Sequence, residues 1–384
     1  MAVSPDTTAP STRVPAQTPA MRQYQDAKRQ YPGTIVFFRM GDFYEMFYED
    51  ALVASRALEL TLTSRSKDAS GGAIPMCGVP YHAVDTYLTR LVRKGYRVAI
   101  CEQVEDPRKA KGVVRREVVR VYSPGTLLDA GSLEAREPAF LMSIVAGGER
   151  LGVALLDAST GEFSVAEYAG AARWQALAVE LAVVRPREIV APADLAVARE
   201  VPEFERFAIP VTTVEPWHAE RESASRTLSD QLRTQTLDGF GLEGRDAAVR
   251  AAGALLRYVR DTQKVDLAHV RTLTLRESAD ALLVDPLTLA HLEIVESREQ
   301  GRAGSLLHEI DRTTTPMGGR MLRAWLLRPL VTLEPIRDRL DAVEDLAFQT
   351  TARGKFRETL KGVLDIERLV ARAALGVAGP RDLA

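Results

Sequence analysis

The chain has 384 residues, of which 46% are hydrophobic, 27% charged and 6% aromatic, and its formal charge is −2. This composition is typical of roughly two to four globular domains and excludes a wholly disordered chain. Two cysteines without a CxxC pair exclude a disulfide scaffold and a cysteine-based zinc site. Because no apolar run reaches the ~18 residues of a membrane span and no signal-peptide pattern is present, we expect a soluble cytoplasmic protein.

The N-terminal pattern predicts a disordered tail and then a short helix. Residues 1–20 are rich in Ser, Thr, Pro and Ala and hold too little apolar surface to fold. We expect order to begin near Met21, in a helix that ends at Pro32-Gly33. A strand is expected next, at residues 34–39, because these residues are mainly β-branched and aromatic.

After this strand the sequence predicts a helix that opens at Gly41-Asp42. Asp42 and Glu45 fit an Asp-x-x-Glu capping box, in which each side chain bonds a free backbone N–H of the first turn. From Ala73 we expect a loop, a helix at 83–94 and a strand at 96–101. Together these elements predict one small mixed α/β domain that ends at about Val121.

The middle of the chain predicts a mixed sheet and the last part predicts helices. Strands are expected at 140–145, 151–157 and 162–168, then a helix at 171–184 and a strand at 188–190. Two hairpins that feed an αβ unit indicate a mixed sheet covered by helices. From Asp246 onward the pattern is almost wholly helical, with helices expected at 246–262, 283–299, 306–311, 318–327, 334–350 and 354–375.

Charge is unevenly distributed along the chain. Residues 21–122 hold 17 lysines and arginines against 12 aspartates and glutamates, a balance of +5 that leaves −7 for residues 123–384. Near the end of the first domain, six basic residues accompany a single acid, Glu117: Arg108, Lys109, Lys111, Arg115, Arg116 and Arg120. This cluster is either a phosphate-binding surface or an ordinary solvated loop.

The sequence shows no complete catalytic apparatus. It has no P-loop, no GxSxG and no HExxH motif, and its five histidines are scattered. One enzyme hypothesis remains, a two-metal nuclease in which Asp157 at the end of a strand is joined by Glu180 and Glu188. The simpler alternative is that Asp157, which precedes Ala-Ser-Thr-Gly, caps a turn.

The most informative stretch is Arg39-Met40-Gly41-Asp42-Phe43-Tyr44-Glu45. In a basic domain, Phe43 can act as an apolar wedge between base steps, at an unstacking cost that falls where a base is mispaired. Glu45 repels phosphate, so it suits a hydrogen bond to a base better than it suits simple affinity. The alternative is that Phe43 belongs to the core and Glu45 only closes the capping box.

Several runs of residues resemble one family. The sequence is similar to the MutS family of bacterial DNA mismatch repair proteins, and the resemblance extends in order from about Met21 to the last residue. It rests on Tyr31–Gly33 through Gly41–Glu45, Ile74–Ala83, Ala99–Pro107, Arg120–Thr126, Thr315–Leu322 and Asp365–Arg368. Agreement over such a length is far more specific than a lone Phe-x-Glu.

The resemblance implies a multidomain α/β plus all-α fold. After the tail at 1–20, it implies a mismatch-binding α/β domain at 21–122 and a linker at 123–136. A ribonuclease-H-like connector domain is expected at 137–262, and the truncated start of a helical core and lever domain at 263–384. The clamp and ATPase domains of the family are absent from the sequence, which therefore resembles an N-terminal portion without enzyme activity of its own.

The resemblance also implies site residues and partners. Phe43 would stack at the mispair and Glu45 would hydrogen-bond the mispaired base, with Met40, Asp42 and Met76 lining the groove. From charge alone, Arg108, Lys109, Arg115 and Arg116 are candidate phosphate contacts. The expected partner is double-stranded DNA with mismatches or small loops. In the full-length family we also expect a MutL-type partner at the connector domain, a homodimer, ATP and Mg²⁺, and a nucleoid-associated location in the cytoplasm. No cofactor is expected in this chain.

Two other classes of function stay open at this point. One is the metal-dependent nuclease around Asp157. The other is a protein-interaction module in which the helical region is the functional part and no DNA is bound.

Overall fold

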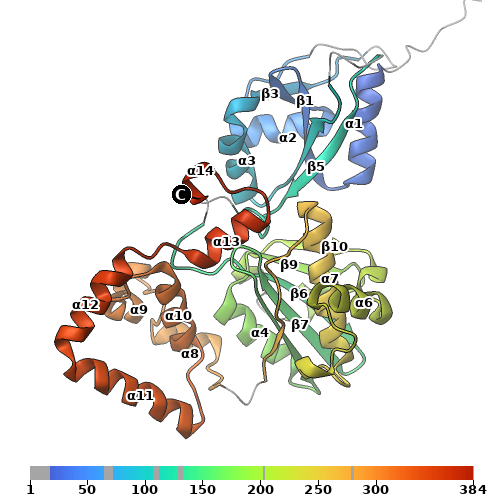
Figure 1. Ribbon diagram of the computed structural model, residues 1–384. Helices are drawn as coiled ribbons and strands as arrows, with labels where there is room; N and C mark the ends of the chain where they lie inside the picture. Colours follow the sequence, from blue (N-terminus) through green and yellow to red (C-terminus); the bar gives the residue numbers. More distant parts are fainter. Residues whose placement is uncertain are drawn as a thin grey trace, which may run out of the picture. The chain divides into compact units, whose positions relative to one another are not determined.

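The computed structural model describes residues 18–64, 72–106, 112–128, 133–201, 204–277 and 281–383. The chain divides into two compact units, one up to Pro124 and one from Gly125 onward (Figure 1). None of the helices in the described ranges combines the length and the apolar character that a membrane span requires. The predicted tail falls mostly on residues outside these ranges, and the first helix begins at Pro19, slightly before the expected Met21.

The first unit is a five-stranded mixed sheet with helices on both faces. The strand order is β3-β2-β1-β4-β5, in which β1 and β4 are parallel and the other neighbours antiparallel. Helix α1 packs on one face and helices α2 and α3 on the other. The bounds are α1 Pro19–Gln30, β1 Thr34–Met40, β2 Phe43–Phe47, α2 Tyr48–Leu58, β3 Met76–Pro80, α3 Val84–Arg93, β4 Arg97–Gln103 and β5 Arg116–Tyr122.

The predicted helix at Gly41-Asp42 is wrong, because residues 43–47 form the strand β2. Phe43-Tyr44-Glu45-Met46-Phe47 is exposed at its first residue and buried at the other four, as expected of a strand that enters a core sheet. Helix α2 begins only at Tyr48, and Phe47, not Asp42, precedes its first turn. Strand β3 was also missed, since part of the segment expected to be a loop pairs with β2.

A buried polar cluster joins α1 to the sheet. The hydroxyl of Tyr24 donates a hydrogen bond to Asp50 Oδ2 at 2.6 Å, and the same carboxylate oxygen accepts the backbone N–H of Val36 at 2.9 Å. Lys28 Nζ lies 2.7 Å from the other oxygen, Asp50 Oδ1. The ring of Tyr24 also packs edge-to-face on Phe47, so this cluster fixes the helix against β1 and β2.

Removing one hydroxyl from this cluster tests its contribution to the first unit. Tyr24→Phe is expected to lower the free energy of unfolding by about 1–3 kcal/mol, because the buried carboxylate of Asp50 loses a donor that nothing replaces. Urea unfolding followed by circular dichroism measures the change. An unchanged midpoint would show that the bond adds nothing to the stability of the fold.

The second unit contains a six-stranded mixed sheet of order β10-β9-β6-β7-β8-β11. The predicted hairpins and αβ unit are confirmed. Helix α7 covers one face of the sheet and helix α4 the other, each over its own apolar core. The bounds are β6 Leu141–Gly147, β7 Arg150–Asp157, β8 Glu162–Ala169, α4 Arg173–Val184, β9 Glu188–Pro192, β10 Val211–Val214, α6 Arg221–Leu232, α7 Asp246–Gln263 and β11 Thr274–Leu275.

Helix α7 lies unusually close to the sheet and to α6. A Cβ atom on Gly152 of β7 would lie 1.9 Å from the backbone oxygen of Ala247, and one on Gly253 would lie 2.4 Å from the Cβ atom of Ala224. Both distances are far below van der Waals contact. Glycine is therefore required at these two positions by close approach of neighbouring elements.

The remaining residues form short helices, and two of the predicted long helices are wrong. The expected helix at 283–299 is only α8 (Pro286–His291), because Glu293 adopts a left-handed φ of 48° and the chain turns there. The expected helix at 354–375 is two helices, α12 (Thr350–Lys361) and α13 (Ile366–Ala374), since Asp365 caps the second through the N–H of Arg368. Helices α9 (Leu306–Ile310), α10 (Pro316–Leu327) and α11 (Leu333–Phe348) match their predictions closely.

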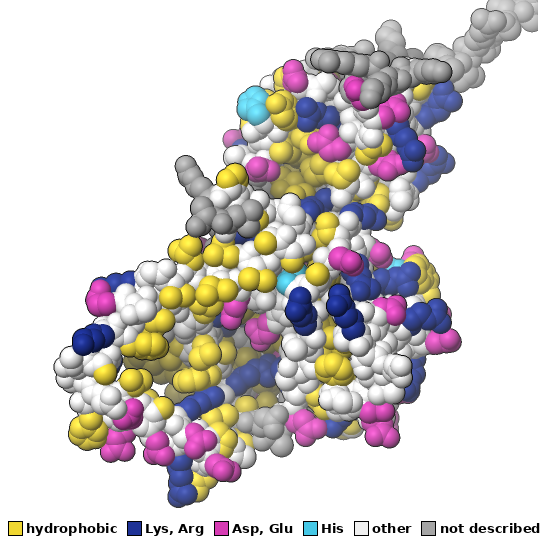
Figure 2. All heavy atoms as spheres, viewed as in Figure 1, with side chains coloured by type: hydrophobic (Ala, Val, Ile, Leu, Met, Phe, Trp, Pro, Cys, Tyr) yellow, Lys and Arg dark blue, Asp and Glu magenta, His cyan; other side chains and the backbone are white. Residues whose placement is uncertain are grey.

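Several large apolar side chains on these helices are exposed. Figure 2 shows hydrophobic side chains gathered over the part of the molecule that contains α9 to α12. The exposed ones on α10, α11 and α12 include Met321, Trp325, Leu340, Val343, Phe348 and Phe356. Helices α11 and α12 hold no buried residue. In the described part of the chain, these two helices therefore have no core of their own.

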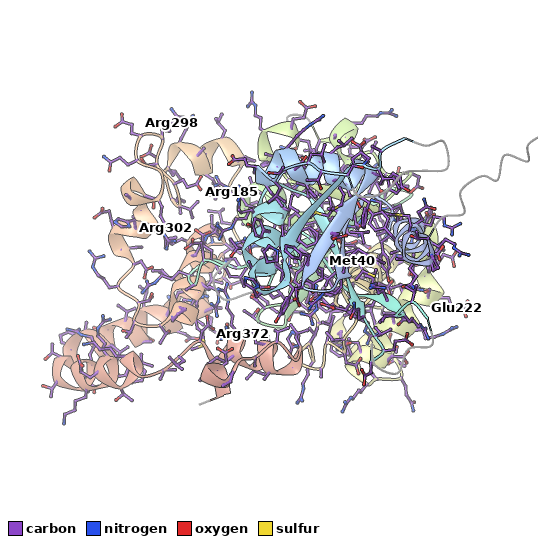
Figure 3. The ribbon with its side chains drawn as sticks, turned by 90° about the horizontal axis from the view of Figure 1, so that it is seen from above. Met40, Arg185, Glu222, Arg298, Arg302 and Arg372 are labelled. Atoms are coloured by element: carbon purple, nitrogen blue, oxygen red, sulfur yellow. The ribbon has the colours of Figure 1, made fainter. Side chains whose placement is uncertain are left out.

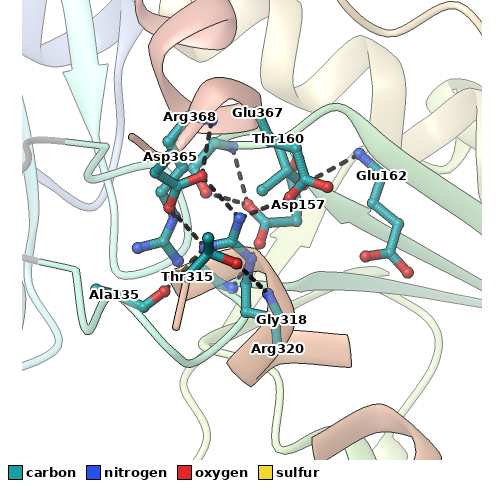
Figure 4. A network of polar contacts seen from close by, with 12 residues as sticks. Ala135, Asp157, Thr160, Glu162, Thr315, Gly318, Arg320, Asp365, Glu367 and Arg368 are labelled. Atoms are coloured by element: carbon teal, nitrogen blue, oxygen red, sulfur yellow. Dashed lines mark hydrogen bonds and ion pairs between the residues drawn. The ribbon is translucent and has the colours of Figure 1, made fainter. Parts of the chain in front are cut away.

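Arginines hold the segment at residues 133–139, which leads into β6. Arg320 of α10 forms a two-bonded ion pair with Asp365, at 2.7 and 2.8 Å, and donates to the backbone oxygen of Ala135 at 2.8 Å (Figure 4). Arg368 of α13 donates to the backbone oxygens of Glu134 and Glu137, at 3.0 and 2.6 Å. The two arginines therefore hold this segment through its main-chain oxygens.

Candidate nucleic-acid interface

A tight hairpin presents Phe43. Strands β1 and β2 are joined by Gly41 and Asp42 alone, with Met40 paired to Phe43 across the turn. Gly41 adopts a positive φ of 60°, the requirement of the first central residue in a type II′ turn. Any residue with a side chain would be strained at this positive φ, which explains why the turn contains glycine.

Two contacts fix this turn, one from β1 itself and one from outside the hairpin. Arg39 Nε donates to the backbone oxygen of Gly41 at 2.5 Å, and the backbone N–H of Tyr81 donates to the oxygen of Asp42 at 2.9 Å. The guanidinium of Arg39 also lies over the Tyr81 ring, 4.1 Å from its centroid. The turn that precedes Phe43 is therefore rigid, a feature that the sequence did not reveal because Tyr81 is distant along the chain.

Phe43 is exposed in a strand that is otherwise buried. Its exposed fraction is 47%, against 5% for Tyr44 and 0% for Met46. Helix α1 covers the same sheet face at the other end of β2, where Tyr24 packs on Phe47. The alternation of side chains along a strand places Phe43, Glu45 and Phe47 on one face, so α1 covers one end of that face and leaves Phe43 accessible.

Gly78 of β3 makes room for both candidate side chains. It pairs with Glu45, and a Cβ atom on it would lie 3.6 Å from the Cγ atom of Glu45 and 3.9 Å from the Cδ1 atom of Phe43. The two side chains therefore lie side by side over a glycine. The sequence contained Gly78 but gave no sign that it lies opposite Glu45.

Glu45 is mostly buried beside the exposed ring. Its exposed fraction is 7%, and it lies opposite Phe38 in the antiparallel pairing of β1 and β2. The capping-box role is wrong, because Glu45 lies in mid-strand, away from a helix start. A carboxylate held next to an exposed aromatic ring can hydrogen-bond the edge of a planar group that stacks on the face of that ring.

The other predicted groove residues differ in position. Met40 (labelled in Figure 3) is half-buried at the end of β1 next to Phe43, and Asp42 is exposed in the turn. Met76 is only 6% exposed and packs in the core with Phe47, its partner at the opposite end of β2 from Phe43. Its burial does not support a role in lining a groove.

The four predicted phosphate contacts also differ in their surroundings. Arg108 and Lys109 lie outside the described residues. Arg115 is exposed and pairs with Glu117. Arg116 donates to the backbone oxygens of Arg39 at 2.6 Å and Val114 at 2.8 Å. Its guanidinium lies over the ring of Phe38, and burial lowers the pKa of Arg116, so this residue braces the sheet.

The three acids of the nuclease hypothesis do not converge. Asp157 accepts the N–H groups of Ala139 and Ser159, at 2.8 and 2.9 Å, and thus caps a turn. Glu188 accepts the hydroxyls of Thr212 and Tyr258, both at 2.6 Å. Glu180 is paired with arginines. In the described ranges, no group of three or more His, Cys, Asp or Glu side chains is placed to hold a metal ion.

The fold and the site define a multidomain protein in which two mixed α/β domains precede a helical region and a rigid hairpin displays an aromatic side chain. The family model MutS domain I matches residues 18–131, MutS domain II matches 139–271 and MutS domain III matches 287–384. These three matches, in order and over most of the sequence, show that the chain belongs to the MutS family.

Curated relatives agree. The chain is 46% identical over 375 residues to the DNA mismatch repair protein MutS of Solibacter usitatus (strain Ellin6076), 44% over 379 residues to that of Methanosarcina barkeri (strain Fusaro / DSM 804) and 45% over 383 residues to that of Myxococcus xanthus (strain DK1622). These matches cover 96%, 95% and 98% of this chain, and the chain spans 42% of the length of each relative.

Proposed function

We propose that this chain recognises mispaired or unpaired bases in double-stranded DNA, with Phe43 as the wedge. The observation that carries the proposal is the 47% exposed phenylalanine on a turn fixed by Arg39 and Tyr81. A side chain that must separate stacked bases needs a rigid support, because any freedom it loses on insertion reduces affinity. The names of the relatives, DNA mismatch repair protein MutS, support the same substrate.

The wedge explains specificity without sequence readout. Inserting an apolar ring between base steps costs a few kcal/mol of unstacking, which is partly regained by stacking on the ring. A mispaired base is less well stacked and paired, so the cost falls at the defect. Binding is therefore strongest where the duplex is weakest.

Glu45 would then identify the opened base. Beside Phe43, its carboxylate can accept a hydrogen bond from a base N–H, or donate one to a purine nitrogen when it is protonated. On a matched duplex no base edge reaches it and its charge repels the phosphates. The same residue thus favours the defect and penalises the intact helix. Met40 and Asp42 adjoin this position.

For the whole protein we propose the roles that the family resemblance implies. Residues 137–262 would be a ribonuclease-H-like connector that contacts a MutL-type partner, and residues 263–384 would begin the helical core and lever domain. The longer protein would act as a homodimer that uses ATP and Mg²⁺, on nucleoid DNA in the cytoplasm.

The direct test is fluorescence anisotropy of this chain with a G·T duplex and its matched control, at two salt concentrations. Tighter binding to the G·T duplex at both concentrations is the expected result. Equal affinity for the two duplexes would contradict mismatch recognition by this part of the protein.

The two neighbouring arginines are expected to behave differently when replaced. Arg115→Ala should weaken binding to both duplexes alike and lower the salt slope by up to about 0.9, the value of one phosphate contact. Arg116→Ala should mainly destabilise the first unit, because it removes two bonds to backbone oxygens. Anisotropy against salt, with urea unfolding of each variant, separates the two effects. A reversed pattern would assign the phosphate contact to Arg116.

A further inference from the structure

A second site lies in the second unit, in a cavity of about 140 Å³ between the sheet and α10. Its walls come from β7, β8, the end of α4 and one face of α10, and much of the lining is aliphatic. Four arginines nevertheless line it: Arg276, Arg320, Arg323 and Arg328. Leaving a guanidinium group without partners in an apolar cavity costs free energy, so each of the four is expected to have hydrogen-bond acceptors.

The acids around the cavity are shared unevenly among these arginines. Arg320 is matched by Asp365 and by Glu367, at 2.6 Å for the latter. Arg276 and Arg328, in contrast, share one oxygen, since Glu180 Oε1 lies 2.5 and 2.6 Å from them. Burial alone would raise the pKa of Glu180, but the two arginines together hold it below its ordinary value. One carboxylate oxygen thus accepts hydrogen bonds from two guanidinium groups, and Glu162, which lines the cavity, acts on both through its charge.

Two guanidinium groups retain donors that nothing in the described structure accepts. Nε and Nη2 of Arg276 are buried and have no hydrogen-bond partner. Arg323 makes no hydrogen bond or ion pair with any described residue, and burial lowers the pKa of Arg323. Buried donors are nearly always satisfied in folded proteins, so the two unmet donors of Arg276 indicate that the cavity holds an acceptor.

A small anion suits this cavity. A guanidinium donates two parallel hydrogen bonds to phosphate or carboxylate oxygens, and several guanidinium groups around one point suit the tetrahedral ion. Larger organic ligands occupy pockets of about 300–1,000 Å³, well above this volume, whereas one water needs only about 10–15 Å³. The cavity therefore fits a phosphate-sized ion with accompanying water.

We propose that this cavity binds inorganic phosphate, held by Arg276, Arg323 and Arg328. The bound ion would accept the unpartnered donors of Arg276 and bridge the end of the sheet to helix α10. The site is independent of mismatch recognition, which is assigned to the other unit. One residue opposes it, since Glu162 also lines the cavity and its carboxylate repels an anion.

Titration calorimetry with sodium phosphate, with sodium chloride at equal ionic strength as the blank, tests the site. Arg323→Gln is the informative variant, because it breaks no contact of the fold, and it should weaken phosphate binding about tenfold to a hundredfold. Glu162→Gln should tighten binding severalfold, an effect that a purely structural role would not produce. Arg276→Gln should also lose binding but removes an ion pair to Glu180.

Matched controls complete the experiment. Arg298→Gln changes an exposed arginine (labelled in Figure 3) that does not line the cavity, and it should leave phosphate affinity unchanged. Adenosine monophosphate serves as a second probe: if it competes with phosphate, the site takes the phosphate group of a nucleotide, and if it does not, the site takes the free ion. Absence of phosphate binding by the unmodified chain, or equal affinity in Arg323→Gln, would overturn the proposal.

Discussion

Replacing Phe43 with alanine is expected to abolish the preference for a mismatched duplex while leaving weaker, salt-sensitive binding to any duplex. Stacking of one base on an aromatic side chain contributes about 1–3 kcal/mol, so affinity for the G·T duplex should fall about tenfold to a hundredfold. Affinity for the matched duplex should barely change, because it depends on phosphate contacts. Phe43 is largely exposed, so its loss should cost the fold little.

Tyr96 provides the matched control for this variant. It is also an exposed aromatic residue of the first unit, at 38%, but it precedes β4, at the end of the sheet where Thr34 pairs with Arg97. Tyr96→Ala should therefore keep full discrimination between the duplexes. If Phe43→Ala and Tyr96→Ala behave alike in anisotropy measurements, the wedge hypothesis fails.

The second large effect is expected on stability. In Gly152→Ala the new methyl group would lie 1.9 Å from the oxygen and 2.2 Å from the carbonyl carbon of Ala247, at the first turn of α7. Because these are backbone atoms, no rotamer change relieves the overlap and the helix must move away from the sheet. We expect a loss of about 3 kcal/mol or more, and a fall in Tm of about 6–12 °C.

A second glycine controls for the change of residue itself. Gly239 has no atom within 4 Å of an added Cβ and does not require a positive φ, so Gly239→Ala should leave the Tm within about 2 °C. Differential scanning calorimetry of both variants measures the difference. A similar Tm for both would show that α7 can shift on the sheet at little cost.

Much of the fold could be predicted from local patterns, and the errors have physical causes. Strands β6, β7 and β8 were predicted because apolar runs between glycine-rich turns have few other interpretations. The segment after Met40 failed because Asp42 and Glu45 fit a capping box while residues 43–47 also suit a strand. Pairing with β1 and β3 decided between them, and such long-range pairing is invisible in a local window.

The candidate site was predicted in part for the same reason. Phe43 and Glu45 were expected where a strand meets a helix, and the strand β2 instead places both on one face. The residues that support them, Gly78 and Tyr81, come from other segments and were missed. Arg116 was assigned to phosphate on charge alone, although its bonds to backbone oxygens occupy it within the fold.

Arg320 and Arg368 hold the segment before β6, and the way they hold it determines which sequence changes this segment tolerates. Both arginines bind main-chain oxygens, at residues 134, 135 and 137, which every amino acid possesses. The side chains of residues 134 and 135 can vary without loosening these bonds, whereas Arg136 is itself held by an ion pair with Asp311 at 2.6 Å. A deletion or insertion of one residue, however, would displace the oxygens by about 3.3–3.8 Å, out of bonding range. The segment is therefore permissive in identity at some positions but strict in length.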